Sequence, residues 1–344
     1  MPSLPARPDF QQLRHQARDL LRAAQGGDAA ALARVHAVGT EVGLANAQLA
    51  VAREYGFASW ARLKAEVDRR EILDDVDAAG LADLLAREPR LAVAEMTQWC
   101  DHPLGASPLD YVAMLRYDTS RDVWRDVPGA APLAHVLLAA GAPVDGEPGG
   151  PETPLITAAS YGDAEVAQVL IQAGADLEAT SSPTSGGVPG GTALLHAAVF
   201  GMTAVVDVLV KAGARVGDLV IGAAAGDISG WPLGEASPQQ RLLALIMAAD
   251  HERLAVIEAL VAAGTPVDGV DEIWGRHPLR LAAANGRPAS VQRLLALGAD
   301  PNQRDADGLT PLDLCRAGRS HHAAGTGHAE VERILEPITA PEPS

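Results

Sequence analysis

Aromatic residues and cysteine are both scarce in this chain. Only 3% of its 344 residues are Phe, Trp or Tyr, twelve in all. Proteins that bind single-stranded nucleic acid stack the bases on aromatic side chains, so this composition argues against such a surface. Two cysteines occur, Cys100 and Cys315, with no C-x-x-C pair. Two distant thiols exclude a disulfide framework, argue against a structural zinc site with paired ligands, and fit a reducing cytosol best.

Lysine and long apolar runs are also lacking. Only 2 of the 27 basic residues are Lys, and together with the abundance of Ala this favours a GC-rich, bacterial genome. No run of 18 apolar residues occurs, which predicts that no segment spans a membrane. The first residues, MPSLPARPDFQQL, contain no apolar stretch typical of a signal peptide. We therefore expect a cytoplasmic protein.

Charge is distributed unevenly along the chain. The net charge is −17, yet residues 1–70 carry 10 basic and 7 acidic residues, and the remainder carries 17 and 37. Nucleic acids and anionic lipids are bound mainly through Lys and Arg, so an acidic chain argues against both as partners. The acidity either keeps an alanine-rich protein soluble or attracts a basic partner. The first 70 residues are expected to form a separate unit.

A pattern that recurs at about 33 residues dominates the remainder. A Leu is followed at +3 and +4 by Ala, at +7 by Gly and at +19 by Gly. The copies begin at Leu155, Leu194, Leu245 and Leu279, and Glu252 replaces the first Gly of the third copy. Leu312 opens another repeat with TPLDLC, without the later Ala and Gly residues. The step from Leu279 to Leu312 is 33 residues, and the step from Leu245 to Leu279 is 34. A shared period of this length is typical of stacked helical repeats.

Segments such as TPLITAASYGDAEVAQVLIQAGAD resemble the ankyrin repeat, whose signature T-P-L-H-x-A-A is followed by Gly, an apolar helix and G-A-D. Thr-Pro predicts a capped helix start, and the Gly at +7 predicts a left-handed helix end. No single repeat can bury its apolar face alone, so the copies must stack. The resemblance implies an all-α ankyrin-repeat solenoid of about seven repeats over residues 71–336, with a small N-terminal helical unit.

The repeat spacing departs from 33 residues at several places, which predicts insertions near residues 116–130, 181–191, 227–238 and 318–326. Residues 337–344 are expected to form a tail.

Residues 1–70 predict four helices, with breaks around Gly26–Asp28 and Tyr55–Phe57. Ser59 is a plausible cap of the last of these helices. This segment is similar to the helical unit that precedes ankyrin repeats in many bacterial proteins, a resemblance that implies no activity. Tyr55, Phe57 and Trp60 are expected to form a local aromatic core.

No motif for catalysis or for a cofactor is present. A phosphate-binding loop, a dinucleotide fingerprint and a nucleophile elbow are all missing. We interpret the segment with the histidines at 321, 322 and 328 as a solvated loop. The stretch Asp305–Gly308 is typical of an ordinary ankyrin hairpin rather than a calcium loop. We therefore predict no metal site. Asp250, His251 and Glu252 form the one acid–base cluster on a repeat. Helix neighbours point about 100° apart, so we expect no catalytic dyad and a surface histidine.

The resemblance also implies which residues bind. In ankyrin repeats the side chains at +2, +5 and +6 after the repeat Leu face a concave groove. Three of the twelve aromatic residues take such positions: Tyr111, Tyr161 and Phe200. The predicted binding set adds further residues of the groove and of the insertions: Trp124, His196, Trp231, His251, Trp274 and Asn285. Two alternatives stay open, because the insertion at 116–130 either leaves this groove open or folds back over it.

These observations predict a non-catalytic scaffold that holds a partner protein in the concave groove. The alternative is a small-molecule-binding protein or an enzyme whose pocket is closed by the insertions. Its lining would include Tyr111, Tyr161, His196, Phe200 and His251. Fold alone does not decide between them.

Overall fold

The computed structural model describes residues 4–5, 7–96, 106–118, 123–125, 127–272, 275–320 and 327–340. The chain forms two compact units. The first contains residues 1–112 and 129–143, and the second contains residues 113–128 and 144–344. The chain therefore passes from one unit to the other after residues 112, 128 and 143. A boundary at residue 70 stays a prediction.

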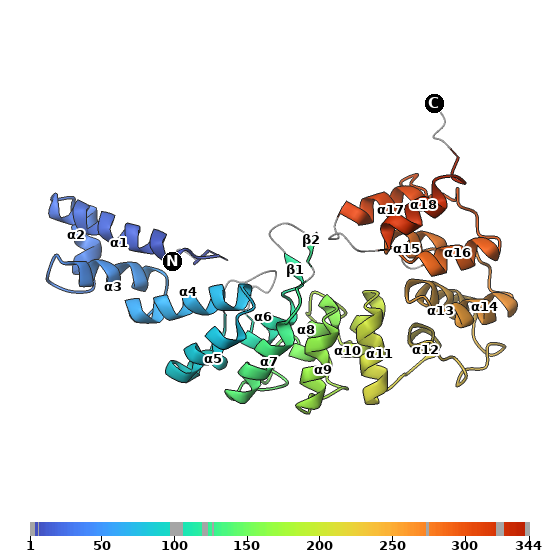
Figure 1. Cartoon of the computed structure of the whole chain (residues 1–344), viewed down its shortest axis with the longest axis horizontal. Coiled ribbons are helices and arrows are strands. Elements are labelled where there is room, and N and C mark those ends of the chain that lie inside the picture. Colours follow the sequence, from blue (N-terminus) through green and yellow to red (C-terminus); the bar gives the residue numbers. More distant parts are fainter. Residues whose placement is uncertain are drawn as a thin grey trace. The chain divides into compact units, whose positions relative to one another are not determined.

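The first unit begins with four helices: α1 (Phe10–Gln25), α2 (Ala29–His36), α3 (Leu44–Glu54) and α4 (Trp60–Asp74) (Figure 1). Their breaks lie where the sequence predicts them. The side chain of Asp28 accepts a hydrogen bond at the start of α2, and Ser59 caps α4 in the same way. Helix α1 packs against α2 and α3, and α3 packs against α4.

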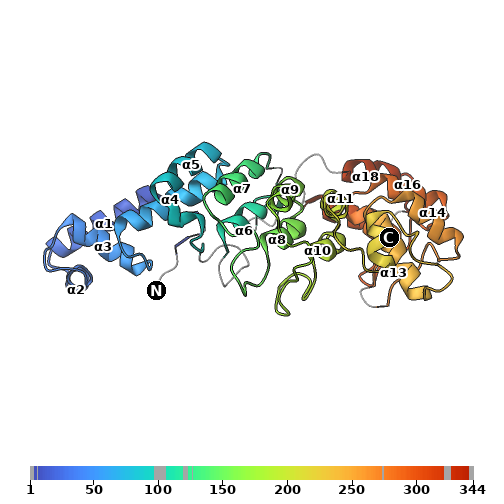
Figure 2. The ribbon, with the colours of Figure 1, turned by 90° about the horizontal axis from the view of Figure 1, so that it is seen from below.

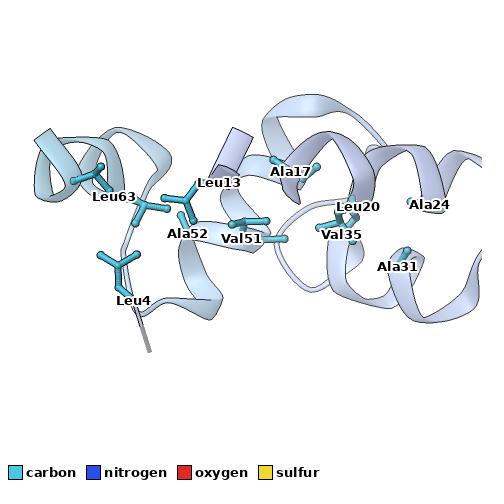
Figure 3. Packing of buried hydrophobic residues seen from close by; sticks show 13 residues of the cluster. Leu4, Leu13, Ala17, Leu20, Ala24, Ala31, Val35, Val51, Ala52 and Leu63 are labelled. Atoms are coloured by element: carbon cyan, nitrogen blue, oxygen red, sulfur yellow. The ribbon is translucent and has the colours of Figure 1, made fainter. Parts of the chain in front are cut away.

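A small apolar core holds these helices together (Figure 3). Leu13 and Leu20 of α1 lie in one cluster with Val35, Val51 and Leu63 of the other helices. Tyr55, Phe57 and Trp60 are partly buried against this cluster, which confirms the predicted aromatic contribution. The rest of the unit consists of α5 (Ala78–Arg87), the 3-10 turn η1 (Pro89–Ala92), α6 (Pro108–Ala113) and α7 (Ala130–Ala139), with α5 packed on α4 and α7.

Three charged side chains of α4 are buried together and connect this helix to η1 and the segment that follows it. The Glu66 carboxylate accepts hydrogen bonds from Arg69 Nη2 and, at 2.9 Å, from Arg70 Nε. Arg69 Nη1 also donates to the carbonyls of Leu91 and Ala94, both at 2.7 Å. All three charged side chains are at most 6% exposed. A buried charge is tolerated only while its partners remain, so Glu66 balances two guanidinium groups at once.

Replacing this carboxylate tests its role. We expect Glu66→Ala to lower the free energy of unfolding by about 3–5 kcal/mol, because two buried guanidinium groups lose their counter-charge. Glu71→Ala, an exposed position on the same helix, is the matched control and should change it by less than about 0.5 kcal/mol. Urea unfolding followed by circular dichroism measures both. Equal losses in the two variants would contradict the assigned role.

The second unit is a stack of helices in two layers. The first helix of each repeat belongs to one layer: α8 (Pro154–Tyr161), α10 (Ala193–Val199), α12 (Leu219–Ala225), α13 (Pro238–Asp250), α15 (Pro278–Ala284) and α17 (Pro311–Ser320). The second helices are α9 (Ala164–Gln172), α11 (Thr203–Ala212), α14 (Leu254–Ala262), α16 (Pro288–Ala296) and α18 (His328–Leu335). Helices α8 and α10 pack side by side in the first layer, and α9 and α11 in the second (Figure 2).

The helix caps predicted from the sequence are present at both ends of α8. Thr153 accepts a hydrogen bond from the amide of Ile156, and Pro154 takes the first helical position of α8. Gly162 ends the helix with a φ of +72°, in the left-handed region that a side chain makes unfavourable. The fold is therefore the all-α helical stack that the repeat pattern predicts.

One repeat is incomplete. Helix α12 is followed by a loop over residues 226–237, where the sequence predicts an insertion, and the next helix is α13. Trp231 of this loop packs on α12 at Gly222, since a Cβ built at Gly222 would lie 2.6 Å from its ring. Ser237 and Gln240 then form a reciprocal cap at the start of α13. The loop and Trp231 thus stand where other repeats place a second helix.

Candidate functional site

The insertion at residues 116–130 contributes a short hairpin to the second unit. Its strands are β1 (Tyr117–Asp118) and β2 (Val123–Trp124), which pair antiparallel with Tyr117 opposite Trp124 (Figure 1). Arg116 donates a hydrogen bond to the carbonyl of Gly162, directly after α8. Arg125 Nη2 donates to the carbonyl of Leu115 at 3.0 Å. The first contact holds the hairpin at the end of α8, and the second joins the two ends of the hairpin segment.

Three aromatic rings meet where the hairpin reaches α8. The ring centroids of Tyr117 and Trp124 lie 4.9 Å apart, and Tyr161 lies 5.9 Å from Tyr117 and 6.3 Å from Trp124. Such separations are typical of favourable aromatic pairs. Each of the three side chains is partly exposed. At Tyr161 the insertion therefore folds back onto the repeat, which is the second of the two alternatives left open by the sequence.

Phe200 lies on the neighbouring repeat. It follows α10 directly, its side chain is 39% exposed, and its ring lies 6.1 Å from that of His196 in an edge-on arrangement. The turns after α8 and α10 are adjacent, since a Cβ at Gly162 would lie 2.5 Å from the sulfur of Met202. We call Tyr117, Trp124, Tyr161 and Phe200 the aromatic face. Sequence reasoning missed Tyr117, because only the strand register places it opposite Trp124.

Two predicted groove residues are buried instead. Tyr111 has no exposed surface, and its hydroxyl donates to Asp74 within the first unit. His196 is also fully buried, with Nδ1 2.9 Å from Ser160 Oγ and Nε2 3.0 Å from the carbonyl of Val188. The expectation that both face solvent is wrong. The cause at His196 is the insertion at 181–191, which folds over the ring.

His251 is likewise not the surface residue that we expected, since it is 1% exposed. Its Nδ1 lies 3.0 Å from Thr203 Oγ1, and its Nε2 lies 2.9 Å from the carbonyl of Ala198. The turn after α13 approaches α10 and α11 closely here, and that approach buries the ring.

The two acidic residues next to His251 in the sequence form hydrogen bonds with other residues. Asp250 is also buried and accepts a hydrogen bond from the side-chain Nδ2 of Asn285 at 2.8 Å. The carboxylate of Glu252 accepts from the amide of Ala289 at 2.9 Å, at the start of the next repeat's second helix. These adjacent acid and base side chains therefore contact different partners.

The remaining predicted residues have separate surroundings. Trp231 is partly exposed and packs on its own helix at Gly222. Asn285 is partly buried and bonded to Asp250. Trp274 lies outside the described residues. The structure thus brings Tyr161 and Trp124 together with Tyr117, and it places Phe200 on the next turn.

Burial controls the protonation of the histidines of this unit. It lowers the pKa of His196, His251 and His328, and it lowers the pKa of His277 to about 4. In each case the removal of the ring from water disfavours the charged imidazolium. All four histidines are therefore neutral near pH 7, and they act as hydrogen-bonding groups of the fold.

These shifts predict how stability depends on pH. The unfolded chain binds a proton at each of these histidines near pH 6.5, whereas the folded chain does so only at lower pH. The free energy of unfolding should be greatest above pH 6.5 and decrease as the pH drops toward about 4. His277 alone should account for on the order of 3 kcal/mol of this decrease.

Urea unfolding at pH 7 and pH 5 measures this loss. His251→Gln should show a smaller pH-dependent loss than the unmodified chain, whereas His135→Gln, at an exposed position of α7, should leave it unchanged. A stability that is constant between pH 7 and pH 5 would show that the buried histidines titrate normally.

Metal and membrane features were sought in the same residues. Over the described ranges, no group of three or more His, Cys, Asp or Glu side chains is placed to hold a metal ion. His321 and His322 lie outside those ranges, and Nε2 of His328 lies 2.7 Å from the carbonyl of Ala284. No helix in the described part of the chain is long and apolar enough to cross a membrane.

Comparisons with known proteins agree with the repeat geometry. A family model for three copies of the ankyrin repeat matches residues 129–219, and a second model for many copies matches residues 260–315. The chain is an ankyrin-repeat protein. The matched ranges contain the helix pairs α8–α9, α10–α11 and α15–α16.

Curated relatives share only part of their length with this ankyrin-repeat chain. The Espin-like protein of Homo sapiens is 33% identical over 88 residues, which are 26% of this chain and 8% of that protein. The E3 ubiquitin-protein ligase Ufd4 of Drosophila melanogaster is 39% identical over 83 residues, 24% of this chain and 3% of that protein. Oxysterol-binding protein-related protein 1 of Mus musculus is 30% identical over 109 residues, 31% of this chain and 11% of that protein.

Among solved structures, the human ASB11 ankyrin repeat domain aligns with a TM-score of 0.32 and 23% identity, covering 70% of this chain and 100% of that chain. The curated relatives named above are eukaryotic, and a bacterial origin stays a prediction.

Proposed function

We propose that this chain is a non-catalytic scaffold that binds a partner protein through the aromatic face. Ankyrin repeats are generally modules of protein–protein interaction. One observation carries the proposal: four of the twelve aromatic residues lie on the hairpin β1–β2 and at the adjacent ends of α8 and α10, and each keeps exposed surface. In an alanine-rich chain this is an unusual concentration of large rings.

The chemistry of the aromatic face suits a protein partner. Tyr and Trp are enriched at the energetic centres of interfaces, because they bury much area with few rotatable bonds. The rings of Tyr117, Trp124 and Tyr161 already restrain one another, so binding would immobilise little that is not already fixed. Arg116 and Arg125 hold the hairpin through main-chain carbonyls. The face is therefore preorganised for contact.

The pocket alternative receives no such support. A general base must reach the proton of a substrate. Both ring nitrogens of His196 and of His251 lie within hydrogen-bond distance of hydroxyl or carbonyl oxygens of the protein itself. Ankyrin-repeat proteins are also typically non-enzymatic. Within the proposal, the scaffold acts in the cytoplasm, on the argument from its two cysteines.

Affinity capture from the cytosol of the source cell tests the aromatic face. We expect the unmodified chain to retain a stoichiometric protein, and Phe200→Glu to reduce its recovery about tenfold or more, since a charge would be buried at the centre of the interface. Quantitative mass spectrometry of the captured proteins measures the recovery. Trp124→Ser should show the same loss, because it also removes a ring that supports Tyr161.

The matched control is Leu44→Glu. Leu44 is 44% exposed, close to the exposure of Phe200, and it begins α3, where an acidic residue is favourable. Circular dichroism confirms that each variant is folded. Retention of the same protein by all variants would refute binding through the aromatic face.

A further inference from the structure

A serine of one repeat contacts a buried histidine of the next. Ser160 lies in the last turn of α8, and its Oγ is 2.9 Å from Nδ1 of His196 in α10. The serine is partly exposed, whereas the histidine has no exposed surface. A hydroxyl that solvent reaches, hydrogen-bonded to a base that solvent does not reach, is the arrangement of an activated nucleophile.

The glycine-rich insertion fixes the histidine ring from its other side. His196 Nε2 lies 3.0 Å from the carbonyl of Val188 and 3.3 Å from Ser181 Oγ, which itself donates to that carbonyl at 2.7 Å. A Cβ built at Gly187 would lie 2.9 Å from Cε1 of the ring, and one built at Gly191 would lie 3.0 Å from Cδ2. The loop backbone therefore packs directly on the ring and holds its orientation toward Ser160.

These contacts decide where the protons of the pair lie. Because a carbonyl oxygen only accepts hydrogen bonds, His196 Nε2 carries the ring hydrogen and donates it to Val188. Nδ1 of the neutral ring is then an acceptor. Ser160 Oγ has a second acceptor within reach, the carbonyl of Ile156 at 3.0 Å. Donation to that carbonyl would set lone pairs of Oγ and Nδ1 against each other at 2.9 Å, so the hydroxyl donates to Nδ1.

A carboxylate lies close to this pair. The Cβ position at Gly187 that would meet the His196 ring would also lie 3.5 Å from Glu152 Oε1, and Ser185 Oγ donates a hydrogen bond to the same oxygen. Burial lowers the pKa of His196, and the negative charge of Glu152 opposes that shift. The ring is thus neutral near pH 7 and free to take a proton, and the carboxylate favours the imidazolium that results.

We propose that Ser160 is a modification site that accepts an acyl group from an activated ester, with His196 as its base. Oγ attacks the carbonyl carbon and forms a C–O bond, while its proton passes to Nδ1 of the histidine. The bond from the carbonyl carbon to the leaving oxygen then breaks, and the histidine returns the proton to the leaving group or to water. The products are an ester of Ser160 and a free alcohol. The inference goes beyond the proposed function, because it concerns one covalent event per chain and needs no partner protein.

Acetylation of the full chain by p-nitrophenyl acetate near neutral pH tests this site. Peptide mass spectrometry over a time course measures the rate of acetylation at each residue. We expect Ser160 to react about a hundredfold or more faster than Ser182, a partly exposed serine whose Oγ contacts Thr184 Oγ1 instead. Equal rates at the two serines would overturn the proposal, as would an unmodified Ser160.

The chain provides a matched control for the base. His196→Gln should slow acetylation of Ser160 about a hundredfold or more, because an amide cannot take the proton. His251→Gln removes a second buried histidine, whose Nδ1 likewise contacts a hydroxyl, that of Thr203, and it should change the rate at Ser160 less than about twofold. Circular dichroism checks that both variants are folded. An equal loss in the two variants would show that stability and not the base controls the reaction, and it would overturn the proposal.

The pH profile of the unmodified chain distinguishes a base from a purely structural histidine and needs no variant. The rate at Ser160 should change less than about twofold between pH 7 and pH 8, because the His196 ring is already neutral there. A hydroxyl without a base reacts through its alkoxide, so its rate should rise about tenfold over the same interval. A tenfold rise at Ser160 would overturn the role of His196. Failure of the capture experiment with normal acetylation would refute the proposed function alone and leave the modification site standing.

Discussion

Close stacking of alanine-lined helices is the interaction on which the second unit depends. The alanines at +3 and +4 of the first helices have no exposed surface, as at Ala158, Ala197 and Ala282. Small side chains let the helix backbones approach, but each alanine buries little apolar area. The stability of such a unit is therefore spread over many interfaces, and each repeat needs its neighbours.

Because neighbouring repeats lie close together, side chains of one repeat reach the helix ends of another. Backbone carbonyls near the ends of the first helices lack intrahelical donors and need partners from elsewhere. Side chains of other repeats meet this need. Arg116 donates to the carbonyl of Gly162, Arg253 donates to that of Ala224, and His251 Nε2 lies 2.9 Å from that of Ala198. Positions that the ankyrin resemblance assigns to a partner are thus partly used to cap the fold, and the proposed partner surface consists of the rings that remain exposed.

The sequence predicts well what depends on neighbouring residues. Caps such as Ser59 and Thr153, the left-handed turn at Gly162 and the loop after α12 all follow from local chemistry. It predicts poorly what depends on where an insertion folds. Nothing near His196 in the sequence indicates that residues 181–191 cover it, and nothing near Tyr117 indicates that it lies against Tyr161. Repeat position alone therefore overstated the exposure of the candidate site, although Phe200 is exposed as its repeat position predicts.

The incomplete repeat at α12 has a consequence for cooperativity. The first layer of helices runs on through α12, but no second helix follows α12 in this described part of the chain. Across this joint, single side chains connect the flanking repeats, such as Arg253 with Asp207 and Arg287 with the carbonyl of Gly201. In a repeat array, cooperative unfolding arises from the interfaces between neighbours. Helix α12 packs against α10 and α11 on one side and against α13 on the other, but its repeat adds no second helix to the second layer. We therefore expect the array to be least tightly coupled between α8–α11 and α12–α18, which approach two separate folding blocks.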